Sequence, residues 1–408
     1  MTTTRLRRTR GVAAVLAAAA LLGSLASCGD GGTVRPSEGH GRAGEGADRS
    51  KGKSPAAARA AQEARRGFSL VATGDLLVHD SIIRQARADS GGSGYEFRTM
   101  LAAAKPMASA ADLAICHMET VYGKDGGPFT GYPAFMTPPQ LAQAVKDTGY
   151  DSCSTASNHT LDAGGEGVKR TLDAMDRAGL RHAGSARDKA ESARPAMLRA
   201  GGPGGAKVAQ LAYTYGTNGI PLPEGKPWTV NMIDPARIIA DARAARKAGA
   251  DVVVVSMHWG TEWQEAPDAT QLSVAKRLTA SQVGGRKDID LILGTHAHVP
   301  QAYEKVNGTW VVYGMGDQIA GKMNDPRGTM GSAARFTFAP PRERDGAWTV
   351  RKAEFRPFLM ETTPRHTLVD LAPPAARKAA YERQRAYKTI SDAVLSRGAA
   401  KDGLRVGQ

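Results

Sequence analysis

Short apolar runs alternate with amphipathic stretches from residue 68 onward, and this alternation organises the chain. Runs of this length that end at turn residues predict buried strands, and apolar positions repeating every three to four residues predict helices. The expected strands are 68–75, 112–119, 150–159, 207–211, 251–260, 290–293 and 310–313, and the expected helices are 140–148, 167–178, 238–248 and 270–283. Because strands and helices alternate, we predict an α/β domain with a parallel sheet.

The pattern changes after residue 313. Residues 334–338 and 348–358 alternate apolar and polar positions, as antiparallel strands do. Residues 375–395 have the spacing of a single basic amphipathic helix. We therefore predict one α/β domain over residues 67–372, followed by a basic helix and tail over residues 373–408.

The first 66 residues form no such pattern. Four arginines within residues 5–10 precede an Ala/Leu-rich stretch at 11–25 that is short for a membrane span, and Leu25-Ala26-Ser27-Cys28 matches a bacterial lipobox. We predict a signal peptide over 1–27 and a lipid on Cys28, hence an extracytoplasmic lipoprotein of the cell membrane. An ordinary secreted protein cut nearby, or an uncleaved anchor, is the alternative. Residues 28–66, rich in Gly, Ala, Ser and charge, predict a disordered tether.

Composition narrows the class of protein. The 408 residues are 41% hydrophobic, which suits a globular core, and the formal net charge is +14. Such a charge indicates polyanionic surroundings, but the chain has no nucleic-acid-binding motif, so we expect no nucleic-acid partner. Of three cysteines, Cys28 is assigned to the lipid. Cys116 and Cys153 lie in apolar runs and are interpreted as two buried thiols, with a disulfide as the alternative.

Side chains that can bind metal stand where several apolar runs end. Ligands of open α/β sheets bind outside the carboxyl ends of the strands. The candidates are Asp75, Glu119, Asn158, His258, His296 and His298. Two carboxylates, one amide and three imidazoles are typical of a two-metal hydrolase. Each alone has a structural alternative as a cap, surface acid, turn residue or core histidine. The two histidines of the last run are two apart, so in extended chain they would point to the same side.

Five motifs around these residues resemble the CapA family, which is named for poly-γ-glutamate capsule synthesis and has a calcineurin-like metallophosphatase fold. They are Gly74-Asp75, Met118-Glu119, Ser157-Asn158-His159-x-x-Asp162-x-Gly164, His258-Trp259-Gly260-x-Glu262 and Gly294-x-His296-x-His298-Val299-x-Gln301. The resemblance runs from about residue 68 to residue 358. It implies an α/β/β/α sandwich with an antiparallel strand section and a terminal helix at the C-terminal end.

The resemblance also implies metal ligands. Glu119 takes the place of the aspartate that bridges two metals, and Asp75 matches the aspartate of the first motif. Asn158, His258 and one histidine of the His296/His298 pair match ligands of the second metal, and the other histidine belongs to the first. The implied cofactors are two divalent ions, such as Mn, Zn or Fe.

Two further positions match catalytic roles in the same family. His159 corresponds to the histidine that protonates the leaving group, and Asp162 is placed to orient it. The loop from Tyr213 to Gly219 is interpreted either as a rim of this site or as an ordinary turn after a strand, with equal weight.

The chain departs from the family pattern twice. Leu77 stands where metallophosphatases carry a histidine two residues after the first aspartate, so either His79 substitutes or the first metal site is incomplete. The family's usual Gly-Asn-Phe is Gly316-Asp317-Gln318 here, and Asp317 either adds charge to the site or stabilises a loop. Glu262, in the fourth motif, is a further candidate for the site.

Two functions fit these observations. The first is a metal-dependent hydrolase of a phosphoester or poly-γ-glutamate type substrate in capsule or cell-envelope polymer biosynthesis. The second is a non-catalytic, polymer-binding accessory of a membrane poly-γ-glutamate synthase complex. The missing histidine at Leu77 favours the accessory, whereas the intact Asn158-His159 and His296/His298 pairs favour the enzyme, and the balance lies with the enzyme.

The lipobox generates a test of anchoring. Cys28→Ala removes the thiol that would be lipidated, so the protein should be released from the membrane or remain unprocessed. Membrane fractionation, detergent phase partitioning and the electrophoretic mobility of the mature chain measure this outcome. A variant that partitions and migrates like the original would exclude the lipoprotein interpretation.

Overall fold

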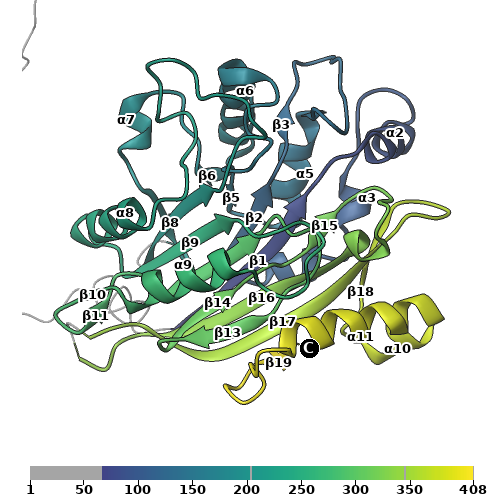
Figure 1. Ribbon diagram of the computed structural model, residues 1–408. Coiled ribbons are helices and arrows are strands. Elements are labelled where there is room, and N and C mark those ends of the chain that lie inside the picture. The colour runs from purple at the N-terminus through teal and green to yellow at the C-terminus, as the bar shows by residue number, and fades with distance from the viewer. Residues whose placement is uncertain (1–66, 203–204, 344–345, 408) are drawn as a thin grey trace, which may run out of the picture. The chain divides into compact units, whose positions relative to one another are not determined.

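The computed structural model describes residues 67–202, 205–343 and 346–407 (Figure 1). The signal peptide over 1–27, the lipidation of Cys28 and the tether over 28–66 lie outside the described residues and stay predictions. Within the described ranges, no helix has the length and apolar character needed to cross a membrane.

The larger of two main sheets has nine strands. Its order is β18-β17-β16-β1-β2-β5-β6, with β15 beside β1 and β19 beside β17. Strands β15, β1, β2, β5 and β6 are parallel, and β1, β16, β17 and β18 pair antiparallel. The bounds are β1 Phe68–Leu76, β2 Leu113–Met118, β5 Ser152–Ser154, β6 Arg181–Ala183, β15 Asp317–Ile319, β16 Met330–Ala339, β17 Thr349–Glu361, β18 Thr367–Asp370 and β19 Arg405–Val406.

The second sheet has six strands in the order β13-β14-β12-β9-β8-β7, parallel at its centre and antiparallel at both edges. Both sheets are therefore mixed: their central strands are parallel, as predicted, and the antiparallel strands include those predicted after residue 313. The bounds are β7 Ala196–Arg199, β8 Lys207–Thr214, β9 Val252–His258, β12 Leu291–Thr295, β13 Tyr303–Val306 and β14 Thr309–Val312. Two small sheets pair β3 (Val121–Tyr122) with β4 (Met136–Thr137), and β10 (Gln282–Val283) with β11 (Arg286–Lys287).

Helices cover the outer faces of the two sheets (Figure 1). The outer faces need this cover because the strands carry apolar side chains on both faces. Leu70 and Val254 contribute to a core between the sheets, whereas Val71 packs under the helices of one outer face and Val253 under those of the other. The helices are α2 Asp80–Asp89, α3 Arg98–Leu101, α4 Lys105–Ser109, α5 Gln140–Thr148, α6 Gly164–Ala178, α7 Lys189–Ser192, α8 Pro235–Lys247, α9 Ala269–Ala280, η1 Pro326–Thr329, α10 Pro374–Lys378 and α11 Tyr381–Leu395. The expected α/β/β/α sandwich is confirmed.

Two predicted helix boundaries are wrong. The helix expected over 270–283 is α9, which ends at Ala280, and residues 282–283 instead form a hairpin strand. Gly284 and Gly285 take positive φ angles of 58° and 78° and make the hairpin turn possible. The helix expected over 375–395 is divided at Ala380, whose backbone is extended. No glycine or proline marks that break, so local sequence did not reveal it.

The C-terminal segment is part of the same packed unit. Helix α11 buries Ala386, Ile390 and Val394 in the core cluster that also holds strand residues of both sheets, and β19 pairs with β17. Residues 373–407 therefore pack on the nine-stranded sheet.

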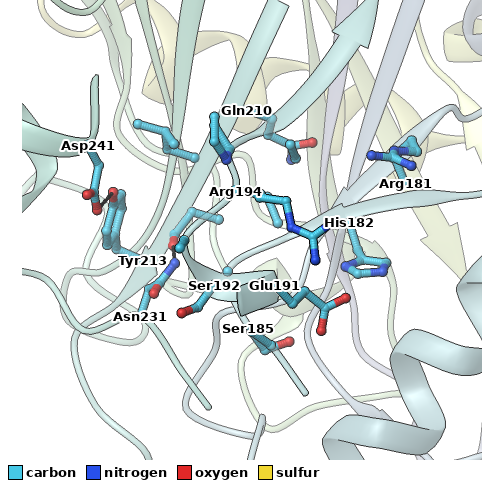
Figure 2. A pocket seen from close by; sticks show the side chains of 18 of the residues that line it. Arg181, His182, Ser185, Glu191, Ser192, Arg194, Gln210, Tyr213, Asn231 and Asp241 are labelled. Atoms are coloured by element: carbon cyan, nitrogen blue, oxygen red, sulfur yellow. Dashed lines mark hydrogen bonds between the residues drawn. The ribbon is translucent and has the colours of Figure 1, made fainter. Parts of the chain in front are cut away.

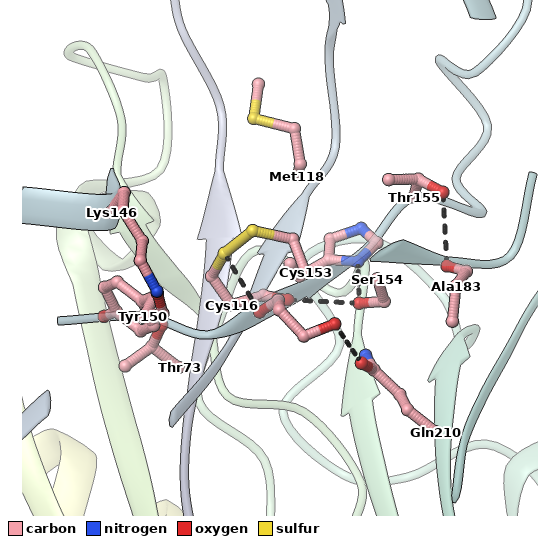
Figure 3. Close-up of a disulfide and its surroundings, with 12 residues drawn as sticks. Thr73, Cys116, Met118, Lys146, Tyr150, Cys153, Ser154, Thr155, Ala183 and Gln210 are labelled. Atoms are coloured by element: carbon pink, nitrogen blue, oxygen red, sulfur yellow. Dashed lines mark hydrogen bonds between the residues drawn. A yellow bond between two sulfur atoms is a disulfide. The ribbon is translucent and has the colours of Figure 1, made fainter. Parts of the chain in front are cut away.

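Cys116 and Cys153 are joined by a disulfide (Figure 3), which corrects the interpretation of two separate thiols. They lie on β2 and β5, which are parallel neighbours, and they are register partners with Cα atoms 4.4 Å apart. This register brings together two residues separated by 37 positions, and the apolar pattern alone does not specify it.

Candidate metal centre

The six predicted ligand residues come together where strands of the two sheets end. Asp75 lies near the end of β1 and Glu119 directly follows β2, whereas His258 ends β9 and His296 directly follows β12. The backbone amide of His296 donates a hydrogen bond to Asp75 Oδ2 at 3.1 Å, which joins the sheets at this point. All six are buried, with 0–5% of their surface exposed: Asp75, Glu119, Asn158, His258, His296 and His298.

The segment after β12 is bent, so the expectation of two histidines in extended chain is wrong. His296 and His298 have positive φ angles of 94° and 53°, a region that residues other than glycine rarely adopt. Their ring centroids are 6.0 Å apart. Backbone strain of this kind persists where surrounding structure imposes it, and it clusters at functional sites.

A first cluster contains Asp75, Glu119, His298 and Asp317, each with a ligand atom within 4.8 Å of the others. The imidazole lies among the carboxylates. His298 Nδ1 is 3.0 Å from Asp317 Oδ1 and 3.7 Å from Asp75 Oδ2, and its Nε2 is 3.7 Å from Glu119 Oε1.

A second group is built from Asn158, His258 and His296. His258 Nε2 lies 2.8 Å from Asn158 Oδ1 and 3.8 Å from Glu119 Oε1, so Glu119 reaches both groups. The rings of His258 and His296 have centroids 4.7 Å apart. Glu119 thus lies between the two groups, and the bridging role that the sequence resemblance implies stays a prediction.

Several polar atoms at this place are buried without a hydrogen-bond partner among the described residues. They are Asp75 Oδ1, both carboxylate oxygens of Glu119, His117 Nε2, His296 Nδ1 and Asp317 Oδ2. Buried polar atoms are almost always partnered, because leaving one unpaired costs on the order of 1–3 kcal/mol. Oxygen and imidazole nitrogen atoms converging in this way fit divalent cations.

The electrostatics of the carboxylates point the same way. Burial raises the pKa of Asp75 to about 8, and the neighbouring Asp317 charge adds to the effect. Burial likewise raises the pKa of Glu119 and of Asp317. Burial tends to lower the pKa of His298, but the charges of Asp317, Glu119 and Asp75 outweigh it and raise that pKa well above its usual value. A bound cation would be a positively charged partner for these carboxylates and would lower their pKa values again.

His159 and Asp162 form a pair beside the metal ligands. His159 Nδ1 lies 2.7 Å from Asp162 Oδ2, and the same oxygen accepts a hydrogen bond from the Phe135 amide at 2.7 Å. The Phe135 ring meets the imidazole edge-on, with centroids 4.7 Å apart. An ionised Asp162 only accepts, so Nδ1 carries the hydrogen and Nε2 is left for another partner.

The remaining candidates differ in position. His79 does not substitute for the missing histidine, because it belongs to none of the candidate metal clusters among the described residues and its Nδ1 accepts from the Gly321 amide at 3.1 Å. Glu262 is exposed but can meet His296 and His298, with ligand atoms within 4.8 Å.

In the structure Tyr213 and Thr214 still belong to β8, and the part of the predicted loop that follows them reaches the site. The Tyr215 ring lies 4.4 Å from the His296 ring between centroids, and Asn218 Oδ1 accepts a hydrogen bond from Asn158 Nδ2 at 3.1 Å. The structure therefore supports the interpretation of this segment as a rim of the candidate site.

His117 is a site residue that the sequence analysis did not assign. Its Nδ1 lies 2.7 Å from Ser154 Oγ, its Nε2 is 3.7 Å from Asp75 Oδ1, and its ring stacks on that of His258 with centroids 4.6 Å apart. A usable signal was present, because His117 precedes Glu119 by two residues and alternate residues of a strand share a face.

A cavity of about 520 Å³ lies elsewhere, against β6, α7, β8 and α8 (Figure 2). None of the predicted ligands lines it. Its Arg187 is already paired with Asp173, Asp176 and Glu191, and its Tyr213 hydroxyl donates to Asp241 at 2.8 Å. The predicted metal ligands therefore lie outside this cavity.

Comparison with known proteins finds a matching family model and several similar curated proteins. The family model "Bacterial capsule synthesis protein PGA_cap" matches residues 69–322. A probable polyglutamine synthesis accessory protein of Mycobacterium tuberculosis is 28% identical over 221 residues, which are 52% of this chain and 56% of that protein. The capsule biosynthesis protein CapA of Bacillus anthracis is 27% identical over 183 residues, 44% of this chain and 42% of that protein. The chain thus spans about half the length of these curated relatives.

Among solved structures, the 5′-nucleotidase precursor of Thermus thermophilus is similar over 81% of this chain and 59% of its own, with 16% identity and a TM-score of 0.44. At that score the likeness carries no argument about function.

The geometry predicts how metal content depends on the ligands. His296→Ala and His298→Ala should each lose bound divalent metal while the fold is retained, because each removes one imidazole from the cluster. Asn158→Ala should lose metal more weakly, since it removes one neutral oxygen. Metal per chain is measured on protein purified without chelator, with circular dichroism as the check on folding.

His79→Gln is the matched control for these variants, because His79 lies outside the candidate metal clusters. The metal content of this variant should equal that of the wild type. Wild-type metal content in all three ligand variants would leave the metal centre without support.

Chelation should expose a dependence of stability on pH. Native Asp75, Glu119 and Asp317, with raised pKa values, bind more protons than the unfolded chain, so stability falls as pH rises towards 8. His117 and His296, with pKa values lowered to about 3 by burial, act in the opposite direction, but only below their usual value of 6.5. Between pH 7 and 8 the carboxylates and His298, whose pKa is also raised in the folded protein, therefore act in the same direction and decide the sign.

The measurement is the thermal unfolding midpoint of chelated protein at pH 7 and pH 8, compared with protein saturated with Mn²⁺ or Zn²⁺. We expect the midpoint to fall with pH only after chelation, because bound cations keep the carboxylates ionised at both pH values. An equal fall with and without metal would contradict the assignment.

Proposed function

The chain belongs to the bacterial capsule synthesis protein family PGA_cap, and we propose that it is a hydrolase dependent on two divalent metal ions. Its membership bears out the resemblance to CapA that the sequence motifs carry. The proposed substrate is anionic, either a phosphoester or a polymer of the poly-γ-glutamate type, and the proposed setting is capsule or cell-envelope polymer biosynthesis. The names of the relatives support that setting.

One observation carries the proposal: buried carboxylate and imidazole atoms converge at the sheet ends without partners among the described residues. Asp75, Glu119 and His298 would hold the first ion, and Glu119, Asn158, His258 and His296 the second. Bound divalent ions would polarise a scissile group and lower the pKa of a water molecule. Even with three ionised carboxylates, two dications leave a positive site, which suits an anionic substrate.

His159 supplies the proton chemistry in this proposal. Asp162 holds Nδ1 of the imidazole at 2.7 Å, and the Phe135 ring supports its edge, so the ring has a fixed orientation. His159 would then donate a proton to the leaving group through Nε2. Its neighbour in sequence, Asn158, would bind metal, which places the proton donor close to the reacting atoms without making it a ligand.

The alternative is a non-catalytic accessory that binds polymer as part of a membrane synthase complex. Leu77, in place of the first-motif histidine, favours it, and the printed name of the mycobacterial relative includes the word accessory. Both functions place the protein outside the cytoplasm, attached to the membrane through a lipid on Cys28. The net charge of +14 suits an anionic polymer as partner in either case.

A substitution at His159 separates the enzyme from the accessory. His159→Gln should keep the metals and lose rate by roughly 10²–10⁴-fold on a substrate whose leaving group needs a proton. The loss should shrink sharply on an activated aryl phosphate or ester, whose leaving group departs without one. Asp162→Asn should show a smaller version of this pattern, because it only orients the imidazole.

The assay compares wild type and variants on poor and activated leaving groups, with metal content determined in each preparation. Equal activity of His159→Gln on every substrate would exclude the general-acid role. A metal-loaded wild type that is inactive on phosphoesters and on γ-glutamyl polymer would favour the accessory.

A further inference from the structure

We infer that Asp317 is a ligand of the first metal and makes that position selective for Mn²⁺ over Zn²⁺. The inference rests on the proposed function, because it concerns the same metal centre. Asp317 would take the place of the histidine that is missing at Leu77. The two metal positions would then differ in chemistry, one rich in oxygen and the other rich in nitrogen.

The backbone places Asp317 beside Asp75. Strand β15 runs parallel to β1, and Asp75 and Asp317 are register partners. The strands approach closely because both adjoining residues are glycines: a Cβ added at Gly74 would lie 1.8 Å from the carbonyl oxygen of Gly316. The Asp75 amide donates to that same oxygen at 3.0 Å. Asp75, near the end of β1, and Asp317, which begins β15, therefore lie side by side.

The contacts of Asp317 are not those of a loop stabiliser. A carboxylate that stabilises a loop accepts hydrogen bonds from nearby amides or hydroxyl groups. Asp317 is 1% exposed, its Oδ1 meets His298 Nδ1 at 3.0 Å, and its Oδ2 has no partner among the described residues. One carboxylate oxygen of Asp317 thus belongs to the cluster formed with Asp75, Glu119 and His298.

Neither Leu77 nor His79 fills the place of the missing histidine, and His117, whose Nε2 lies 3.7 Å from Asp75 Oδ1, groups with Asp75 and His258. Leu77 is apolar and 4% exposed, and His79 uses Nδ1 to accept from the Gly321 amide. The four ligand atoms that lie within 4.8 Å of one another come from Asp75, Glu119, His298 and Asp317. The first position is therefore complete, with an aspartate where a histidine is expected.

This replacement changes the preferred ion. Carboxylates suit Mg²⁺, Ca²⁺ and Mn²⁺, whereas imidazoles suit Zn²⁺ and Fe²⁺. Three carboxylates and one imidazole favour Mn²⁺, which accepts oxygen ligands readily and still binds a histidine nitrogen. The group of Asn158, His258 and His296 has two imidazoles and one neutral oxygen besides Glu119, and it favours Zn²⁺ or Fe²⁺.

The test measures metal binding and not turnover. Metal-free protein is titrated with Mn²⁺ by equilibrium dialysis and by electron paramagnetic resonance, with and without one equivalent of Zn²⁺. In Asp317→Asn, which keeps the shape and removes the charge, Mn²⁺ affinity should fall at least about tenfold, while binding of the first Zn²⁺ is unchanged. Asp317→His, with two carboxylates and two imidazoles, should shift the preference of the first position towards Zn²⁺.

Asp392→Asn is the control for loss of one carboxylate, because Asp392 lies on the surface of α11 and pairs there with Lys388. It should bind Mn²⁺ as the wild type does. Unchanged Mn²⁺ affinity in Asp317→Asn, or an unchanged Mn²⁺/Zn²⁺ preference in Asp317→His should Asp317→Asn fail to fold, would overturn the inference while leaving the metal centre intact. A wild type that binds neither ion would instead overturn the proposed function.

Discussion

The structure around the candidate metal centre depends on the free-energy cost of burying three carboxylates close together. Asp75, Glu119 and Asp317 are desolvated in a small volume where the ends of two sheets meet, and burial raises the pKa of each. Like charges buried together oppose folding unless a positive partner is present. His298 lies among them but offers one charge at most. The surrounding structure holds these groups in place: β1 and β2 carry two of the carboxylates, and the His296 amide ties Asp75 to the other sheet.

Glycine makes this meeting of strands possible. A Cβ at Gly74 would lie 1.8 Å from the Gly316 carbonyl oxygen, and one at Gly294 would lie 2.0 Å from the Tyr313 carbonyl oxygen. Side chains at these positions would push apart the strand ends that carry the ligands. The segment after β12 is bent beside these contacts, with positive φ angles at His296 and His298. The close packing of the strand ends therefore also determines where the candidate ligands lie.

The sequence alone predicted much of the site, because a ligand at a strand end needs only local pattern. Asp75, Glu119 and His258 follow directly from apolar runs that stop at a polar residue. Features that depend on register between distant strands were beyond that pattern. The Cys116–Cys153 disulfide and the pairing of Asp317 with Asp75 both arise from strands that become neighbours only in the fold. The break at Ala380 was equally hidden, because no glycine or proline marks it.

The choice between enzyme and accessory depends on His159 more than on the metal ligands. Buried carboxylates argue for a cation, but a cation can serve structure alone. Asp162 does not distinguish the enzyme from the accessory either, because its Oδ2 also accepts a hydrogen bond from the Phe135 amide and so stabilises the segment around Phe135. His159 is different, because the pair with Asp162 fixes Nδ1 as the donor and leaves Nε2 on the opposite edge of a ring already held by Phe135. A purely structural metal site has no use for an oriented imidazole that is not a ligand, whereas a leaving group that needs a proton does. We therefore infer that the orientation of His159 supports the proposed hydrolase more than it supports the proposed polymer-binding accessory.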